Sequence, residues 1–480
     1  MSGEAKPPIS RTTIAAGLIA VLGLVLVVFA LLAGVASLFH TAAPAAVAPA
    51  APAAVPAAAG AEPPAEQAET ADHAAPGGET DGDQGFLYGR VTTSTGGAYE
   101  GRLRWGKGDQ EAFWGDYFNG TKEKNVWVEY LAPGQVPRER FSFRIFGLDI
   151  HHGDRELDLD RMFMTRFGDI ARIVAGLNEI RVTLKSGAEF VLNRQAASDI
   201  DDGLRVWDKT RGLVDVDWVH TIEFLPTPGL EDVPGRLHGT VHTQHGDFTG
   251  FVQWDRQECI GSDELDGRTD TGDLSLRFET IRSIARRPDA SVLVTQVDGR
   301  EVALHGTNDV GPDNRGIYVD DPRYGRVLVP WNAFERLDVV PDGTGPGYGE
   351  YPKGGPLRGS VTTHDGHRHT GRLVYDLDEG ETTETLDAPS QGVDYTIPFG
   401  LIATIVPAGP EAGRVSCARV VLGSGEELAL ERKGDLGERN AGLLVFAGGS
   451  DHPEYIPWND VAQVDFDRPP ATFPPFGERE

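Results

Sequence analysis

Most of the chain after residue 85 alternates apolar and polar residues with a period of two, and turns containing glycine interrupt the alternation. The run Gly239-Thr-Val-His-Thr243, a turn at Gly246 and a second alternating run that ends at an aromatic residue indicate a β-hairpin. The same pattern occurs three times, which predicts three copies of one all-β unit. The copies open at Gly89, Gly239 and Gly359, and their second strands end at Trp105, Trp254 and Tyr375.

Two further patterns recur in each copy. An aromatic residue is followed by isoleucines at three-residue steps, which suits one 3-10 turn leading into a strand. These triplets are Phe167, Ile170, Ile173; Phe278, Ile281, Ile284; and Phe399, Ile402, Ile405. A second hairpin then surrounds a glycine, at 187, 299 and 425.

The closing segment of each copy is a strand, a tight turn and a short apolar strand. Val329-Pro330-Trp331 and Ile456-Pro457-Trp458 begin this segment in the second and third copies, and we expect Trp218 to keep the same register in the first. A strand ending at proline, one turn and a short strand resembles the closing part of small SH3-type and Sm-like barrels. The two halves of each copy look alike, so the resemblance implies a tandem array of six small barrel units, two in each copy.

The predicted boundaries follow from the spacing of the repeats. The copies are expected at 85–228, 236–341 and 356–468, with a tail at 469–480. The opening glycines are separated by 150 and then 120 residues, so the first copy carries an insertion of about thirty residues. We place this insertion roughly at 106–166.

The N-terminal part of the chain has a different character. Residues 13–39 contain no ionisable side chain and are long enough to cross a bilayer as a helix. Basic residues occur in the preceding segment 1–12, and none follows until Arg90, which places the N-terminus in the cytoplasm. Residues 40–84, rich in Ala and Pro and then acidic, are expected to be an extended linker. We therefore predict a single-pass membrane protein whose repeats lie in the periplasm or at the cell surface; a cleaved signal peptide is the alternative.

The charge and the motifs narrow the function. The chain has 44 basic and 73 acidic residues, a net charge of −29, which repels nucleic acids. Cys259 and Cys417 cannot form a disulfide framework or a four-thiolate metal site, although a bond between them remains an open alternative. Enzyme signatures and phosphate loops are absent from the sequence, so we expect no cofactor and favour a protein that is not an enzyme.

Two groups of polar residues suggest metal chemistry. His364, His367 and His369 lie near one turn and are weak candidates for zinc ligands, but the spacing is not kept in the other copies. Acidic loops recur at 199–203, 308–314 and 434–438. We interpret both groups as turns, with calcium as the alternative for the loops.

The insertion holds the best candidates for partner binding. Trp114, Tyr117, Trp127 and Tyr130 lie among lysines and arginines, a mixture that suits carbohydrate stacking or a protein contact. The alternative is that these rings extend the local core. The sequence thus predicts a non-enzymatic binding or scaffolding module of the cell envelope, with an envelope protein or glycan as its partner. A membrane-anchored hydrolase with an acidic site between the repeats is the alternative.

Overall fold

The computed structural model describes residues 85–106, 110–136, 138–145, 148–156, 159, 162–196, 199–230, 233–343, 345–407 and 417–467. The expected membrane segment 13–39, linker 40–84 and tail 469–480 lie outside these residues. Within the described ranges, no helix has the length and apolar character that a membrane crossing requires.

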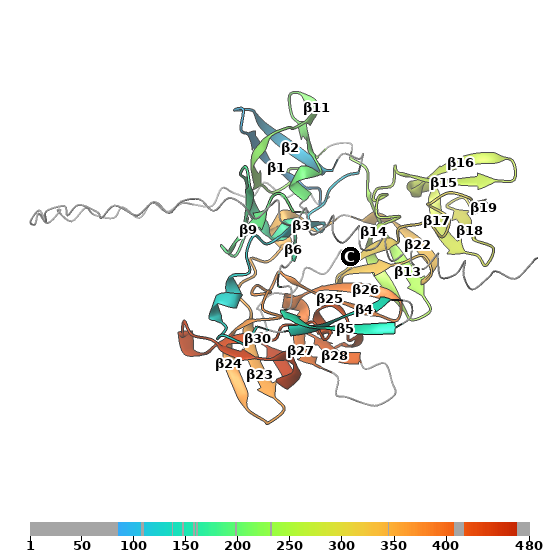
Figure 1. The fold of residues 1–480 in the computed structure, drawn as a ribbon. Coiled ribbons are helices and arrows are strands. Elements are labelled where there is room, and N and C mark those ends of the chain that lie inside the picture. The colour runs from blue at the N-terminus through green and yellow to red at the C-terminus, as the bar shows by residue number, and fades with distance from the viewer. Residues whose placement is uncertain are drawn as a thin grey trace, which may run out of the picture. The chain divides into compact units, whose positions relative to one another are not determined.

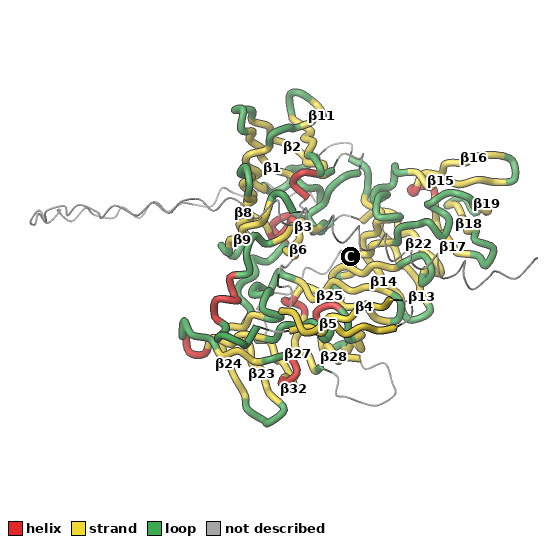
Figure 2. The backbone as a smooth tube through the Cα atoms, viewed as in Figure 1, coloured by secondary structure: helices red, strands yellow, loops and turns green. Residues whose placement is uncertain are grey.

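The prediction of an all-β protein is confirmed. The described residues form strands joined by turns, and their helical elements are 3-10 turns of three to five residues (Figures 1 and 2). The strands make two eight-stranded sheets, one twelve-stranded sheet and two two-stranded sheets, β3–β6 and β4–β5. The small sheets comprise β3 (Tyr117–Thr121), β6 (Met162–Arg166), β4 (Arg138–Ile145) and β5 (Leu148–Glu156).

The first eight-stranded sheet is built from the first copy, in the order β11-β10-β2-β1-β12-β7-β8-β9. All of the pairs in it are antiparallel. Its strands are β1 (Tyr88–Thr93), β2 (Ala98–Trp105), β7 (Ile170–Ala175), β8 (Glu179–Leu184), β9 (Glu189–Asn193), β10 (Leu204–Asp208), β11 (Gly212–Asp215) and β12 (Val219–Phe224).

The twelve-stranded sheet holds the second copy and one hairpin of the third, in the order β16-β15-β19-β18-β17-β22-β13-β14-β20-β21-β26-β25. Its strands are β13 (Arg236–Thr243), β14 (Gly246–Gln253), β15 (Glu264–Thr269), β16 (Gly272–Arg277), β17 (Ile281–Arg286), β18 (Ser291–Gln296), β19 (Glu301–His305), β20 (Ile317–Asp321), β21 (Gly325–Val329), β22 (Phe334–Gly343), β25 (Thr385–Ser390) and β26 (Val393–Pro398).

The second eight-stranded sheet contains the rest of the third copy, in the order β29-β28-β27-β32-β23-β24-β30-β31. Its strands are β23 (Arg358–Thr363), β24 (Arg368–Val374), β27 (Ile402–Val406), β28 (Cys417–Leu422), β29 (Glu427–Glu431), β30 (Leu443–Phe446), β31 (Glu454–Ile456) and β32 (Val461–Phe466). The predicted 3-10 turns are confirmed as η2 (Phe167–Asp169), η4 (Phe278–Thr280) and η6 (Phe399–Leu401), each followed directly by a strand.

The strand order shows how each copy is divided. In the second copy, the contiguous strands β15 to β19 lie together, and the other five strands, β13, β14 and β20 to β22, lie beside them. In the sequence, strands β15 to β19 are inserted between β14 and β20. We call β15 to β19 the inner five-stranded group and the other five strands the outer five-stranded group. The outer group joins strands that are distant in the sequence, because β14 pairs with β20 on the other side of the inner group.

The insertion of the first copy lies within its inner group. Strands β3 and β6 precede η2 as β15 and β16 precede η4, but β15 and β16 are joined by a tight turn after Thr269. The extra chain is thus residues 122–161, a narrower segment than the predicted 106–166. It contains the 3-10 turn η1 (Val126–Tyr130) and strands β4 and β5.

The recurring glycines allow each of the first two strands of a copy to lie close to its other neighbouring strand. Gly239 and Gly250 are directly opposite each other on β13 and β14. A Cβ atom added at Gly250 would lie 1.9 Å from the carbonyl oxygen of Asp320 on β20, so no larger residue fits. The equivalent glycine pairs are Gly89 with Gly101 and Gly359 with Gly371.

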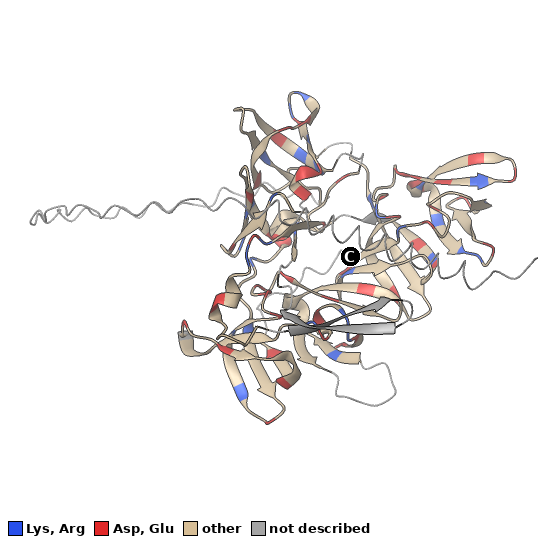
Figure 3. Cartoon of the chain, in the orientation of Figure 1, with Lys and Arg blue, Asp and Glu red and all other residues tan. Residues whose placement is uncertain are grey.

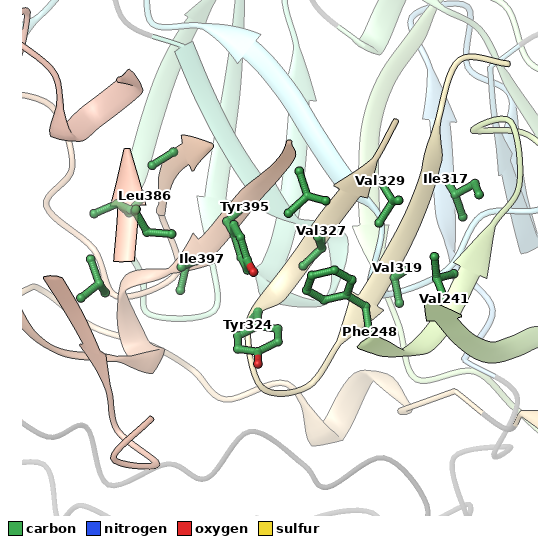
Figure 4. Close-up of a cluster of buried hydrophobic side chains, with 14 of the residues drawn as sticks. Val241, Phe248, Ile317, Val319, Tyr324, Val327, Val329, Leu386, Tyr395 and Ile397 are labelled. Carbon is green, nitrogen blue, oxygen red and sulfur yellow. The ribbon is translucent and has the colours of Figure 1, made fainter. Parts of the chain in front are cut away.

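The second and third copies share a hydrophobic core. Strand β21 pairs with β26 of the next copy, and Val327 lies opposite Tyr395. Phe248, Tyr324 and Tyr395 contact one another across this boundary, with ring centroids 5.6 to 6.0 Å apart (Figure 4). Their burial joins the two copies, since buried aromatic rings contribute strongly to packing.

The prediction that Trp218 keeps the register of Trp331 and Trp458 is wrong. Val219 pairs with Thr93 as Val461 pairs with Thr363, so the equivalent of Trp458 is Val216, which is buried. Trp218 is 73% exposed. In this register the first copy has Asp215 where the others have proline, and Trp218 lies two positions after the core position.

Candidate functional site

The insertion of the first copy packs against the third copy. Its η1 turn begins after Asn125, whose side chain accepts a hydrogen bond from the backbone N–H of Trp127 at 3.0 Å. The Asn125 amide also donates to the carbonyl of Leu377 at 2.9 Å. The Trp127 indole donates to the carbonyl of Asp378 at 3.2 Å. One asparagine therefore both caps the turn and attaches it to the third copy.

A buried ion-pair group lies directly before this turn. The Lys122 ammonium is 2.7 Å from carboxylate oxygens of both Asp378 and Glu384, and all three side chains are less than 10% exposed. Burial alone would lower the pKa of Lys122, but the charges of Asp378 and Glu384 outweigh it and raise that pKa above its ordinary value. Lys122 thus remains an ammonium ion that links two distant parts of the sequence.

A cleft of about 550 Å³ opens beside this group, between the insertion, strand β9 and the third copy. It is within the size range of small-molecule sites. Trp127 and Phe190 line it with aromatic rings, and Arg372 is stacked 5.4 Å from the Trp127 ring. The other lining residues are Lys122, Glu123, Lys124, Asn125, Val126, Ala188, Glu189, Val191, Asp378, Gly380, Glu381 and Glu384.

Glu381 is a partly buried carboxylate of the lining. Its Oε2 atom is buried and has no hydrogen-bond partner among the described residues. Burial raises the pKa of Glu381, and a hydrogen bond with Ser186 opposes the rise. By contrast, Glu384 accepts hydrogen bonds from the backbone N–H groups of Gly380 and Glu381 at 2.7 and 3.0 Å.

An acidic cavity of about 410 Å³ adjoins the cleft, because Asp378 and Glu384 line both. Burial raises the pKa of Asp387 to about 6 and holds that of Glu379 well above its ordinary value. The cavity is lined by Asn119, Met162, Met164, Asp376, Asp378, Glu379, Glu384, Thr385, Asp387 and Asp435.

Three of these six carboxylates, Asp376, Glu384 and Asp435, accept hydrogen bonds from backbone N–H groups, and the contact of Asp435 recurs in the other copies. Asp435 accepts a hydrogen bond from the N–H of Asp387 at 2.6 Å, as Asp309 does from Asp266 at 2.8 Å. In the first copy Asp199 accepts from Asn119 at 2.7 Å. These contacts fix the first hairpin strand of each inner group to an acidic loop.

The aromatic residue that ends the second strand of each copy holds the same loop from its other side. In each case a ring N–H or O–H group donates to the carbonyl of the loop aspartate. The pairs are Trp105 with Asp199 at 2.8 Å, Trp254 with Asp309 at 3.0 Å and Tyr375 with Asp435 at 3.1 Å. The three acidic loops therefore have a shared structural role.

Buried carboxylates give the protein a predictable pH dependence. Burial and the nearby charges of Asp309 and Asp255 raise the pKa of Glu258 to about 8, from an ordinary value of 4.5. A raised pKa in the folded state means that folding favours the protonated form of Glu258. The contribution of Glu258 to the free energy of unfolding is therefore fully present below pH 4.5 and decreases as the pH rises towards 8. We expect the midpoint of thermal unfolding to be at least about 3 °C lower at pH 8 than at pH 5.

The control for this pH effect is the variant Glu258→Gln, in which calorimetry should show a smaller decrease between the two pH values. The exposed Glu264, replaced by glutamine, should leave the decrease unchanged. Equal decreases in the wild type and the Glu258→Gln variant would show that Glu258 does not carry the effect.

The structure separates the four aromatic candidates for partner binding. Trp114 is buried in the core of the first copy, and its indole donates to the Thr227 hydroxyl at 3.0 Å. Tyr117 is 9% exposed and lies away from the cleft, with the Arg326 guanidinium carbon 5.0 Å from its ring centroid. Trp127 lines the cleft, and Tyr130, 42% exposed, lies beside it with its ring 5.3 Å from that of Phe446.

The three histidines do not form a set with other ligands. The Nδ1 atom of His369 is hydrogen-bonded to the Glu454 carboxylate at 2.7 Å, and its ring lies 6.5 Å from that of His367. His364 is exposed, and its backbone N–H donates to the carbonyl of Asp460. Over the described ranges, no group of three His, Cys, Asp or Glu residues is placed to hold a metal ion. Cys259 and Cys417 are not joined by a disulfide bond.

Sequence reasoning missed Phe190, Arg372 and Glu381 as residues of the cleft. They lie in three different segments, and only the docking of the insertion brings them together. Alignment of the copies could have indicated the segment around Glu381. Glu381 and Glu384 of the third copy correspond to Ile260 and Asp263 of the second, and in both copies the later residue accepts a hydrogen bond from the backbone N–H of the earlier one. No family model, curated protein or solved structure matches this chain.

Proposed function

We propose that this protein is a non-enzymatic binding module of the cell envelope and that it binds a glycan in the cleft beside Trp127. Residues 13–39 would anchor it in the membrane and leave the repeats outside the cytoplasm. The observation that carries the proposal is the cleft itself, which combines two aromatic rings with charged and amide groups in a volume of about 550 Å³.

The chemistry of the lining suits a sugar ring. The apolar C–H face of a pyranose packs on aromatic rings such as Trp127 and Phe190, and its hydroxyl groups require fixed donors and acceptors. Arg372 and Glu381 supply such groups at the lining. Nucleic acid is a poor alternative for a chain whose net charge is −29.

The walls of the cleft are fixed before a ligand arrives. The buried Lys122 ion pairs and the hydrogen bonds of Asn125 hold the insertion against the third copy. Acidic and basic residues occur throughout the three large sheets, so net charge alone does not mark this place (Figure 3). A preformed cleft favours binding because little conformational freedom is lost when the ligand enters.

We further infer that each five-stranded group closes into a small barrel. The strand, 3-10 turn and strand at η4 and η6 agree with the closing segment of SH3-type and Sm-like barrels. In this arrangement the barrels form a rigid support, and the insertion of the first copy adds the binding surface. Function is commonly added to such a support in its loops.

Binding is tested by titrating the purified full-length chain with the β-1,4-linked tetramers of N-acetylglucosamine and of glucose in a calorimeter. We expect measurable binding of at least one tetramer. The variant Phe190→Ala should raise its Kd at least about tenfold, equivalent to about 1.4 kcal/mol, because the ring loses its contact with the sugar. Trp127→Phe, which preserves more of the packing, should weaken binding in the same direction.

The matched control is Trp218→Ala, which removes an exposed tryptophan outside the lining of the cleft. It should leave the Kd unchanged. Unfolding midpoints of all variants show whether a loss of binding reflects a loss of structure. If neither tetramer binds, or if Trp218→Ala weakens binding as much as Phe190→Ala, the proposal fails.

Hydrolysis at the acidic cavity is the second candidate function. It is favoured by the raised pKa of Glu379, whose Oε2 atom is buried and lacks a hydrogen-bond partner among the described residues. Against it, Glu258 of the second copy has the same buried, unpartnered atom, which indicates a shared structural feature. Release of reducing sugar from the two tetramers, lost in Glu379→Gln, would support hydrolysis.

A further inference from the structure

Building on the proposed glycan site, we infer that residues 468–476 of the same chain bind in the cleft beside Trp127 and compete there with the glycan. These residues, Arg-Pro-Pro-Ala-Thr-Phe-Pro-Pro-Phe, follow the last strand and lie outside the described residues. We call them the proline-rich segment. Only the competition rests on the proposed function, and the contact between the segment and the cleft is a separate claim.

The first observation is the place where the described chain ends. Directly after β32, the N–H of Asp467 donates to the carbonyl of Arg358 at 2.8 Å. Arg358 lies opposite Arg372 on β24, and Arg372 lines the cleft. Neighbouring strands are about 4.8 Å apart, so the backbone of Asp467 is about 10 Å from that of Arg372.

A second set of contacts leads from the same point to the tryptophan. Leu357, next to Arg358 in the sequence, donates its N–H to the carbonyl of Gly380 at 2.7 Å. A Cβ atom added at Gly380 would lie 3.4 Å from the Trp127 ring. The proline-rich segment therefore begins close to the aromatic lining of the cleft as well as to Arg372.

The segment is long enough to enter the cleft. Proline-rich chains extend by about 3.1 Å per residue, so the six residues after Asp467 span about 19 Å and end at Phe473. This reach is about twice the separation of about 10 Å between Asp467 and Arg372. Phe473 and the residues after it can therefore contact the lining.

The composition of the segment matches the lining. Proline-rich chains bind in grooves lined by aromatic side chains, and they lose little conformational entropy because they are already extended. Trp127 and Phe190 provide aromatic side chains, and further apolar side chains come from Val126, Ala188 and Val191. The segment contains two phenylalanines and four prolines but no acidic residue. The carboxylates of the lining therefore do not repel it.

Attachment to the same chain allows a weak contact to have an effect. A short flexible connection gives the attached segment an effective concentration in the millimolar range. An intrinsic Kd of about 1 mM would then keep the cleft occupied in about half of the molecules. Because the other molecules are open, a saturating glycan can still enter, displace the segment and protect the walls of the cleft further.

The contact is tested by hydrogen–deuterium exchange without any added ligand. The full-length wild type is compared with the full-length double variant Phe473→Ala, Phe476→Ala. We expect amide exchange in residues 122–127 and 188–191 to be at least about twofold faster in the double variant, because its cleft is no longer covered. Unchanged exchange in both ranges would overturn the contact.

A change in the cleft should also be detected in the segment. In the variant Phe190→Ala, the amides of residues 471–473 should exchange faster than in the wild type, because the segment loses an aromatic contact. The control is Leu177→Ala, which removes an apolar side chain that is 94% exposed and outside the lining. It should leave exchange unchanged in the cleft and in the segment. An effect of Leu177→Ala equal to that of Phe190→Ala would also overturn the contact.

The competition is tested by calorimetry with the tetramers of N-acetylglucosamine and of glucose. A tetramer that binds the wild type should bind the double variant Phe473→Ala, Phe476→Ala at least about twofold more tightly, because the segment no longer occupies the cleft. Equal Kd values would overturn the competition. If neither tetramer binds either protein, the proposed function fails, and the exchange measurements alone decide whether the segment binds in the cleft.

Discussion

Replacing Gly250 by alanine is expected to destabilise the protein by about 3 to 5 kcal/mol, at the upper end of the range for single substitutions. The added Cβ atom would lie 1.9 Å from the Asp320 carbonyl oxygen, which is itself held in the β14–β20 pair. The strands would have to separate to accommodate it, because the obstructing atom belongs to the backbone and cannot change rotamer. Urea denaturation of the full-length chain measures the change.

A nearby glycine provides the control for this substitution. Gly235 precedes the same sheet, but a Cβ atom added there would meet nothing within 4 Å. Gly235→Ala should change the free energy of unfolding by less than about 1 kcal/mol. If the Gly235 and Gly250 variants were equally stable, the close approach of β14 and β20 would not be a constraint on the fold.

Replacing Lys122 by alanine has the second large expected effect. It leaves Asp378 and Glu384 buried without their cation, and breaking a buried ion pair on one side typically costs about 3 to 5 kcal/mol. Because Lys122 also attaches the insertion to the third copy, glycan binding should be lost together with stability. Urea denaturation and titration calorimetry measure the two effects.

The adjacent Lys124 serves as a matched control, because its ion pair with Glu129 is exposed. Lys124→Ala should cost less than about 1 kcal/mol. Adding Asp378→Asn and Glu384→Gln to Lys122→Ala should recover part of the lost stability, since the uncompensated charges are removed. No recovery in the triple variant would show that the cost arises from packing and not from charge.

The repeated local features of this fold could be predicted from the sequence. Alternation and turn glycines predicted the hairpins, and Phe278 with Ile281 and Ile284 predicted η4 and the strand after it. These predictions succeeded because they depend on neighbouring residues. Three copies of one pattern also strengthen each assignment, as a chance match would not recur at the same position.

The features that depend on distant pairing were not predictable. Nothing in a period of two shows that β14 pairs with β20, or that β21 pairs with β26 of the next copy. The Lys122–Asp378 contact joins residues that are 256 positions apart. The Val-Asp-Trp motif also led to a wrong prediction for Trp218, which lies two positions after the core residue Val216. Sequence similarity alone does not show which residue enters the core.

Hydrogen–deuterium exchange on the full-length chain, with and without the tetramers of N-acetylglucosamine and of glucose, tests the glycan-binding claim most directly. The account predicts slower exchange on binding in three segments, 122–127, 188–191 and 372–384, which together line the cleft. Strands of the second copy distant from the cleft, such as β15 and β16, should not change. Unchanged exchange in all three segments at saturating tetramer, or protection confined to other parts of the chain, would contradict it.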